Sequence, residues 1–151
     1  MIKQTIEEDL KRAMLGGDKR LVSVLRTIKG AILDAEIASG ARENGLPNDQ
    51  VIVLLQKESK KRGEAATLYA GAGDFERAAN ERYEQEVLAK YLPAQLDEAA
   101  ISVVVDSVLA EMGEVDMREM GKVIGAVKAK TGPSADGSVI AKIVKERLTK
   151  N

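Results

Sequence analysis

The chain has 151 residues, of which 44% are hydrophobic and 31% are charged, and its formal net charge is −1. This composition is typical of a globular protein and excludes wholesale disorder. Because the sequence contains neither cysteine nor histidine, it offers no disulfide, no thiolate or imidazole metal ligand, and no histidine base. No apolar run approaches the roughly 20 residues of a membrane-spanning helix, and no signal peptide is evident, so we expect a cytoplasmic protein.

The first half of the sequence predicts four helices. Apolar residues recur there at helical spacing, as in the stripe Leu21, Leu25, Ile28 and Ile32, and aromatic residues make up only 3% of the chain. Glycine pairs and loops interrupt the pattern, and Asp18 and Asp74 follow two of the breaks as N-caps. The predicted helices cover 2–15, 19–39, 48 or 49 to 70, and 75–91, and the apolar positions assigned to them include Leu68, Tyr69 and Phe75.

A basic run, Lys57 to Arg62, lies in the third predicted helix. Glu58 precedes Arg62 by four residues, and Lys60 precedes Glu64 by the same spacing, which allows ion pairs within the helix. A solvated, self-paired face is the favoured interpretation, and a ligand surface is the alternative.

The segment 90–98 separates two parts of the chain. Pro93 ends the preceding helix near Tyr91 or Leu92, and Asp97 is placed to cap the next one. Tyr91, Leu92 and Leu96 make this connector apolar, so we expect it to pack against its neighbours. We therefore predict two domains, 1–93 and 94–151, and the alternative is an ordinary turn within one domain.

The second part predicts three shorter helices, over 97–112, from 116 to about 131, and from 136 or 138 onward. Val103 to Val105 favour a strand by local propensity, but the apolar residues around them keep the helical period. Met117, Met120, Ile124 and Val127 are predicted to face inward in the sixth helix. Residues 117–151 hold eight basic and three acidic residues, which makes this segment the candidate footprint for a polyanion.

Two glycines, Gly121 and Gly125, lie four residues apart in the sixth predicted helix. Each costs about 1 kcal/mol relative to alanine in a helix interior, so a compensating contact is expected. One explanation is close packing against a neighbouring helix, and the other is close approach of a phosphodiester backbone. Lys122, Lys128 and Lys130 lie nearby and suit the second explanation.

The turn 132–138 leads into the last helix, whose N-terminus could attract an anion. Asp136 is itself an anion placed to cap that helix, and this is the favoured interpretation. Lys142 and Lys145 follow on the last helix, where basic residues also complement the helix dipole. We find no spacing typical of a metal site, a nucleophile with its base, or a nucleotide-binding loop, so no catalytic residue, metal or cofactor is predicted.

Several segments in order resemble the GatB/YqeY family, and they span nearly the whole chain. They are Leu25-Arg-Thr-Ile-Lys-Gly-Ala-Ile32, Gln56-Lys-Glu-Ser-Lys-Lys-Arg62, Tyr91-Leu-Pro-Ala-Gln-Leu96, Met120-Gly-Lys-Val-Ile-Gly125 and Ala135-Asp-Gly137. The resemblance implies a bacterial, all-α protein with an N-terminal hairpin or bundle of long helices and a C-terminal module of three helices. That module is similar to the tail domain of GatB, a subunit of the glutamine-dependent tRNA amidotransferase, where the tail helps to hold tRNA.

The resemblance implies kinship with a carbon–nitrogen ligase that uses glutamine as amide donor, but this chain lacks the parts that perform that chemistry. It places Lys122, Lys128 and the turn around Gly137 on an RNA-facing surface. Serine stands at positions 134 and 138, and aspartate at 74, where the family pattern usually has basic residues.

We therefore expect a monomeric, non-catalytic module that binds tRNA or a tRNA-bound enzyme, and the alternative is a helical protein–protein adaptor that does not bind nucleic acid. The residues expected to contact RNA are Lys122, Lys128, Lys130, Gly137, Lys142 and Lys145.

Overall fold

A computed structural model describes residues 1–149 of the chain, and these contain seven α-helices and no β-strand. The all-α prediction is therefore confirmed. The helices are α1 (Ile2–Gly16), α2 (Lys19–Ser39), α3 (Asn48–Gly71), α4 (Phe75–Ala89), α5 (Glu98–Met112), α6 (Met120–Thr131) and α7 (Gly137–Thr149). Two short 3₁₀ turns, Met117–Glu119 and Gly132–Ser134, flank α6. No helix among the described residues is long and apolar enough to cross a membrane.

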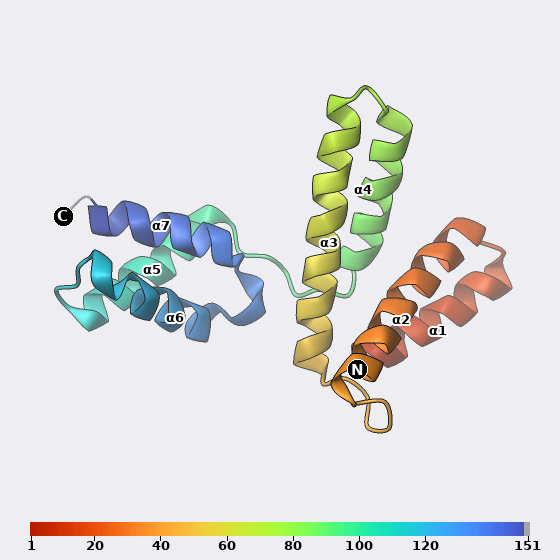
Figure 1. Cartoon of the computed structure of the whole chain (residues 1–151), viewed down its shortest axis with the longest axis horizontal. Helices are drawn as coiled ribbons and strands as arrows, with labels where there is room; N and C mark the ends of the chain where they lie inside the picture. Colours follow the sequence, from red (N-terminus) through yellow and green to blue (C-terminus); the bar gives the residue numbers. More distant parts are fainter. Residues whose placement is uncertain (150–151) are drawn as a thin grey trace. The chain divides into compact units, whose positions relative to one another are not determined.

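The chain divides into two compact units, Met1–Leu92 and Pro93–Asn151. In the first unit, α1 and α2 form one antiparallel hairpin, and α3 and α4 form another (Figure 1). The predicted caps are confirmed: the Asp18 carboxylate accepts the Leu21 N–H at 3.1 Å, and the Asp74 carboxylate accepts the Arg77 N–H at 3.1 Å. Gly17 takes the left-handed conformation that ends α1.

Apolar stripes of both hairpins form the core of the first unit. Its buried members are Ile6, Leu10, Ala13, Val24, Leu25, Ile28, Ile32, Val51, Leu55, Val87 and Leu88. The prediction that Leu68 lies on a buried side is wrong, since it is 74% exposed, and the helical stripe position Phe75 is 71% exposed. Both lie near the turn between α3 and α4, where two helices alone bury only a narrow seam filled by Ala66 and Ala78.

The basic run of α3 is partly built into the seam with α4. Arg62 contacts Glu58 on its own helix at 2.8 Å and Glu84 on α4 at 3.1 Å, and its side chain is only 11% exposed. The predicted Glu58–Arg62 pair is thus confirmed, but no Lys60–Glu64 pair is found among residues 1–149. Arg62 is therefore a bridge between two helices and is not free to bind a ligand.

Gly63 makes room for a side chain from α4. The Gln85 amide donates to the Ser59 carbonyl at 3.0 Å, and a Cβ atom on Gly63 would lie 2.7 Å from that same amide nitrogen. A Cβ atom on Gly30, in the middle of α2, would meet no such neighbour within 4 Å among residues 1–149.

We expect Gly63→Ala to leave the free energy of unfolding nearly unchanged, whereas Gly30→Ala should raise it by about 1 kcal/mol, the helix-propensity gain. At Gly63 the same gain is offset by loss of the Gln85–Ser59 hydrogen bond, which contributes about 1 kcal/mol. Urea unfolding measures the free energy of unfolding of both variants and of Gly63→Ala in a Gln85→Ala background. In the Gln85→Ala background, Gly63→Ala should raise the free energy of unfolding by the full helix-propensity gain. If it does not, contact with Gln85 is not what offsets the gain at Gly63.

The apolar connector packs as predicted. α4 ends at Ala89, before the expected Tyr91 or Leu92, because the last turn tightens into hydrogen bonds from Tyr91 to Leu88 and from Leu92 to Ala89. Tyr91 and Leu92 pack against the core of the first unit, and Leu96 packs against the core of the second.

The second unit is a bundle of α5, α6 and α7 (Figure 1). Its buried members are Ile101, Val105, Val108, Val123, Val127, Ile140, Ile143, Val144 and Leu148. The Asp97 carboxylate caps α5 by accepting the Ala100 N–H at 2.7 Å, and the valine run lies in this helix as predicted. Met117 does not face inward as predicted: it is 42% exposed, because it belongs to the short turn that Asp116 caps ahead of α6.

Candidate nucleic-acid interface

The two glycines of α6 face open space. A Cβ atom built on Gly121 or on Gly125 would meet no heavy atom within 4 Å among the described residues, and both glycines are exposed. The explanation by close packing against a neighbouring helix is therefore wrong. The buried stripe of α6 is instead formed by Val123 and Val127, and the glycines lie on another face of the same helix.

Two lysines flank this glycine face. Helical spacing places Gly121 and Gly125 between Lys122 on one side and Lys128 on the other. Both lysines are exposed, and neither forms an ion pair within the part of the chain that the structure describes. A flat backbone surface bordered by two ammonium groups is suited to an anionic backbone, because a missing side chain allows closer approach to both charges.

The Lys128 side chain extends to the start of α7. Its Cε and Nζ atoms lie 3.4 and 3.5 Å from the position that a Cβ atom on Gly137 would take. Lys128 thus lies beside the N-terminus of α7, where unpaired backbone N–H groups add partial positive charge. The structure brings Lys128 and Gly137 together from two helices.

Asp136 already occupies the N-terminus of α7, which leaves less of it available to bind another anion. Its carboxylate accepts hydrogen bonds from the Ser138 N–H at 2.8 Å and from the Ser138 hydroxyl at 2.7 Å. Its carbonyl also accepts the first helical hydrogen bond, from Ile140. The favoured interpretation, that Asp136 caps α7, is therefore confirmed. Attraction of an anion to the N-terminus of α7 thus depends more on the charge of Lys128 than on the backbone N–H groups of the helix.

Three basic residues of α6 and α7 have acidic partners on α5. The Lys130 ammonium lies 2.7 Å from the Glu111 carboxylate, and the Lys142 ammonium lies 3.2 Å from that of Glu98. Arg147 pairs in the same way with Asp106 at 2.9 Å. Because these partners are 19 to 44 positions apart in the sequence, only the packing of the three helices reveals that much of the basic charge is offset.

The candidate residues therefore fall into three groups. Lys122, Lys128 and Gly137 surround the glycine face and the adjoining end of α7. Lys130 and Lys142 are exposed but paired with acids. Lys145 is exposed on α7 and has no ion pair within the described chain. Of the two explanations that the sequence offered for the glycine pair, close approach of a phosphodiester backbone is the one that the open face still allows.

The sequence model of the family described as Yqey-like protein matches residues 3–148. No curated protein matches the sequence.

Proposed function

Because the chain belongs to the YqeY-like protein family, we propose that its second unit binds tRNA, or a tRNA-bound enzyme, and does so without chemistry of its own. The contact surface is the glycine face of α6 with Lys122 and Lys128. The resemblance to the tail domain of GatB supports tRNA as the ligand. On this proposal the relation to the carbon–nitrogen ligase is one of kinship and not of activity.

The observation that carries the proposal is the open pair of glycines. Gly125, in the interior of α6, lowers stability by about 1 kcal/mol relative to alanine, and Gly121, in the first turn, lowers it by less. Among residues 1–149, no atom lies within 4 Å of a Cβ built on Gly121 or Gly125, so no neighbour in that part of the chain would exclude alanine. A phosphodiester backbone lying across this face would supply the missing contact, and the two flanking lysines would neutralise its phosphates.

Charge reversal at the two flanking lysines tests the proposal. We expect Lys122→Glu with Lys128→Glu to weaken tRNA binding at least tenfold near 0.1 M salt, and to lower the salt dependence by about 0.9 per lost phosphate contact. Fluorescence anisotropy of labelled total tRNA, titrated at two salt concentrations, measures both quantities.

The matched control is Lys57→Glu with Lys60→Glu, which makes the same charge change on exposed positions of α3. Equal weakening by this control would show that only overall charge matters and would contradict the proposed site. If the unmodified chain fails to bind tRNA even at low salt, the adaptor function is favoured instead. The exposed Leu68 and Phe75 at the end of the α3–α4 hairpin would then be the first surface to test with protein partners.

A further inference from the structure

The three most exposed large apolar side chains among residues 1–149 lie at the ends of the two hairpins of the first unit. Leu15, in the last turn of α1, is 90% exposed, and Leu68 and Phe75, on either side of the turn between α3 and α4, are 74% and 71% exposed. Figure 1 shows both turns at the hairpin ends that lie away from the loop between α2 and α3. Exposed apolar surface that gathers in this way marks a contact surface.

The two hairpin ends carry opposite net charge. Residues 9–25, here called the α1–α2 tip, hold four basic and two acidic residues, a net charge of +2. Residues 64–80, the α3–α4 tip, hold one basic and three acidic residues, a net charge of −2. Because the two segments have the same length and are centred on their turns, each tip is complementary in charge to the other and repels its own kind.

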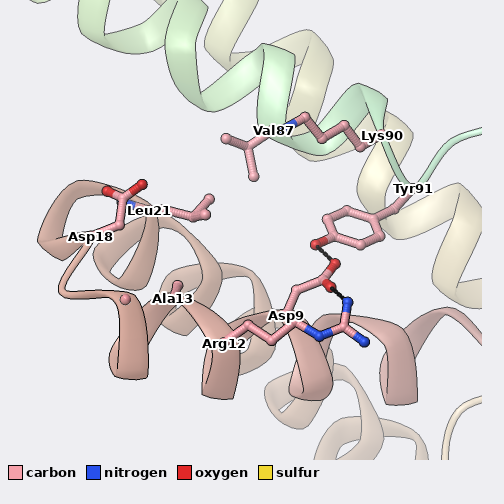
Figure 2. Close-up of a pocket in the computed structure, with 9 residues that line it drawn as sticks. Asp9, Arg12, Ala13, Asp18, Leu21, Val87, Lys90 and Tyr91 are labelled. Carbon is pink, nitrogen blue, oxygen red and sulfur yellow. Dashed lines mark hydrogen bonds and ion pairs between the residues drawn. The ribbon is translucent and has the colours of Figure 1, made fainter.

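Two cations of the α1–α2 tip are already engaged within the chain. Arg12 lies 3.6 Å from one oxygen of the Asp9 carboxylate, and the other oxygen accepts a hydrogen bond from the Tyr91 hydroxyl (Figure 2). The Arg20 guanidinium stacks over the Tyr83 ring, 3.8 Å from its centroid. These contacts hold both arginines against the first unit.

The two lysines of the α1–α2 tip remain unpaired. Lys11 and Lys19 are exposed, and neither forms an ion pair within residues 1–149. Lys11 lies one helical turn before Leu15 and therefore on the same side of α1. The remaining carboxylate of this tip, Asp18, accepts the Leu21 N–H as the cap of α2. Even with Asp18 counted, the tip keeps positive charge beside its exposed leucine.

The α3–α4 tip shows the reverse arrangement. Its basic residue, Arg77, lies 3.5 Å from Asp74, which also caps α4. Glu64 and Glu76 are exposed and have no ion pair in the described part of the chain. Glu64 lies one turn before one of the exposed apolar side chains, and Glu76 directly follows the other. Unpaired negative charge thus borders the apolar surface of this tip.

In place of the monomer expected from the sequence, we propose that the chain associates with a second copy of itself, with the α1–α2 tip of one copy docked on the α3–α4 tip of the other. Leu15 packs against Leu68 and Phe75, and the unpaired lysines meet the unpaired glutamates. Because each copy carries both tips, the contact forms twice about a two-fold axis and closes a dimer. The second unit takes no part, so this association is independent of tRNA binding.

Sedimentation velocity of the whole chain, freed of nucleic acid, tests the association. We expect the weight-average mass to rise from one chain toward two between about 10 µM and about 1 mM, because contact surfaces this small bind weakly. The rise should be smaller in 0.5 M than in 0.1 M salt, since salt screens the exposed charges. A chain that remains monomeric at about 1 mM overturns the proposal and leaves the two tips to a different protein partner.

Charge reversal identifies the surfaces. Lys11→Glu with Lys19→Glu makes both tips negative, and Glu64→Lys with Glu76→Lys makes both positive, so each variant alone should associate at least tenfold more weakly. An equimolar mixture of the two variants should regain the association, because every tip again meets its opposite. A mixture that associates no better than either variant alone would overturn the proposed pairing.

Matched controls complete the test. Arg42→Glu with Lys57→Glu makes the same charge change at exposed positions outside both tips and should leave the association unchanged. Leu15→Ser should weaken association at least fivefold, whereas Ile37→Ser, at a 55% exposed position of α2, should not. Equal effects of the two serine variants would show that Leu15 is not part of the contact and would contradict the assignment.

Discussion

Replacing both exposed glycines of α6, as Gly121→Ala with Gly125→Ala, is expected to stabilise the second unit and to weaken tRNA binding in the same molecule. Alanine removes the conformational entropy penalty of glycine, and neither new methyl group meets a neighbour within 4 Å in the described part of the chain. The gain should be about 1–2 kcal/mol in total, because Gly121 lies in the first turn of α6, where propensity contributes less.

The same two methyl groups would stand between the helix and an RNA backbone. We therefore expect tRNA affinity to fall at least tenfold, an effect of about 1.4 kcal/mol in the direction opposite to the gain in stability. Differential scanning calorimetry should show the transition of the second unit raised by several degrees, since about 1 kcal/mol shifts a domain of this size by roughly 4–8 °C. Anisotropy measures the affinity.

The control for this experiment is Gly30→Ala in α2, which also enters open space. It should stabilise the first unit and leave tRNA binding unchanged. A double alanine variant that gains stability and retains full affinity would remove the reason for assigning RNA to this face.

The second large effect concerns the buried charge in the first unit. Within residues 1–149, Glu36 is the charged residue that is buried, with 1% of its surface exposed. Lys3 donates to its two carboxylate oxygens at 2.8 and 3.1 Å, and the Leu46 N–H reaches it at 3.4 Å. These contacts join the start of α1, the end of α2 and the loop before α3.

We expect Lys3→Met to lower the free energy of unfolding by about 2 kcal/mol, because it leaves the Glu36 carboxylate buried without its cation. Removing one partner of a fully buried pair costs about 3–5 kcal/mol. The lower figure applies here because the Lys3 side chain is 34% exposed and water screens the pair. Urea unfolding at pH 7 gives the value, and Lys11→Met, at an exposed position of α1, should change it little.

The same contact predicts a pH dependence. The hydrogen bond from Lys3, the largest cause, lowers the pKa of Glu36 below its usual value of 4.5 despite the opposing effect of burial. A carboxyl group with a lowered pKa in the folded state stabilises the fold above its unfolded pKa, and this stability is lost as pH falls through the folded value. The stability difference between the unmodified chain and Glu36→Gln should therefore shrink as pH falls below about 4.5. A difference that stays constant down to pH 3 would show that the charge of Glu36 does not stabilise the fold.

The local course of the chain could be predicted well from sequence. Asp18, Asp74 and Asp97 each cap the helix that follows them, and α2 covers Lys19–Ser39 as predicted. These features depend on backbone geometry and on residues within one helical turn, so the information lies close together in the sequence. The same holds for the apolar connector, where Tyr91, Leu92 and Leu96 pack against the cores of their own units.

Contacts between helices could not be predicted in this way. Leu68 and Phe75 fit a helical stripe, yet they are exposed because no third helix of the first unit covers the end of the α3–α4 hairpin. Lys130 and Lys142 count toward a basic segment, yet Glu111 and Glu98 on α5 lie within 2.7 and 3.2 Å of them. The structure likewise shows that Gly63 accommodates Gln85 while Gly121 and Gly125 accommodate nothing within the described chain.

The sequence by itself therefore determined the helices, most of their ends and the all-α class, because propensity, capping and periodicity act over a few residues. The end of α4 and the start of α6 differ from the prediction, because a tightened last turn and a short 3₁₀ turn replace α-helix there. Only the tertiary structure decided which glycines are free, which lysines keep an unbalanced charge, and which apolar side chains stay exposed. Those properties depend on which side chains from distant segments meet, and they define the candidate sites of this protein.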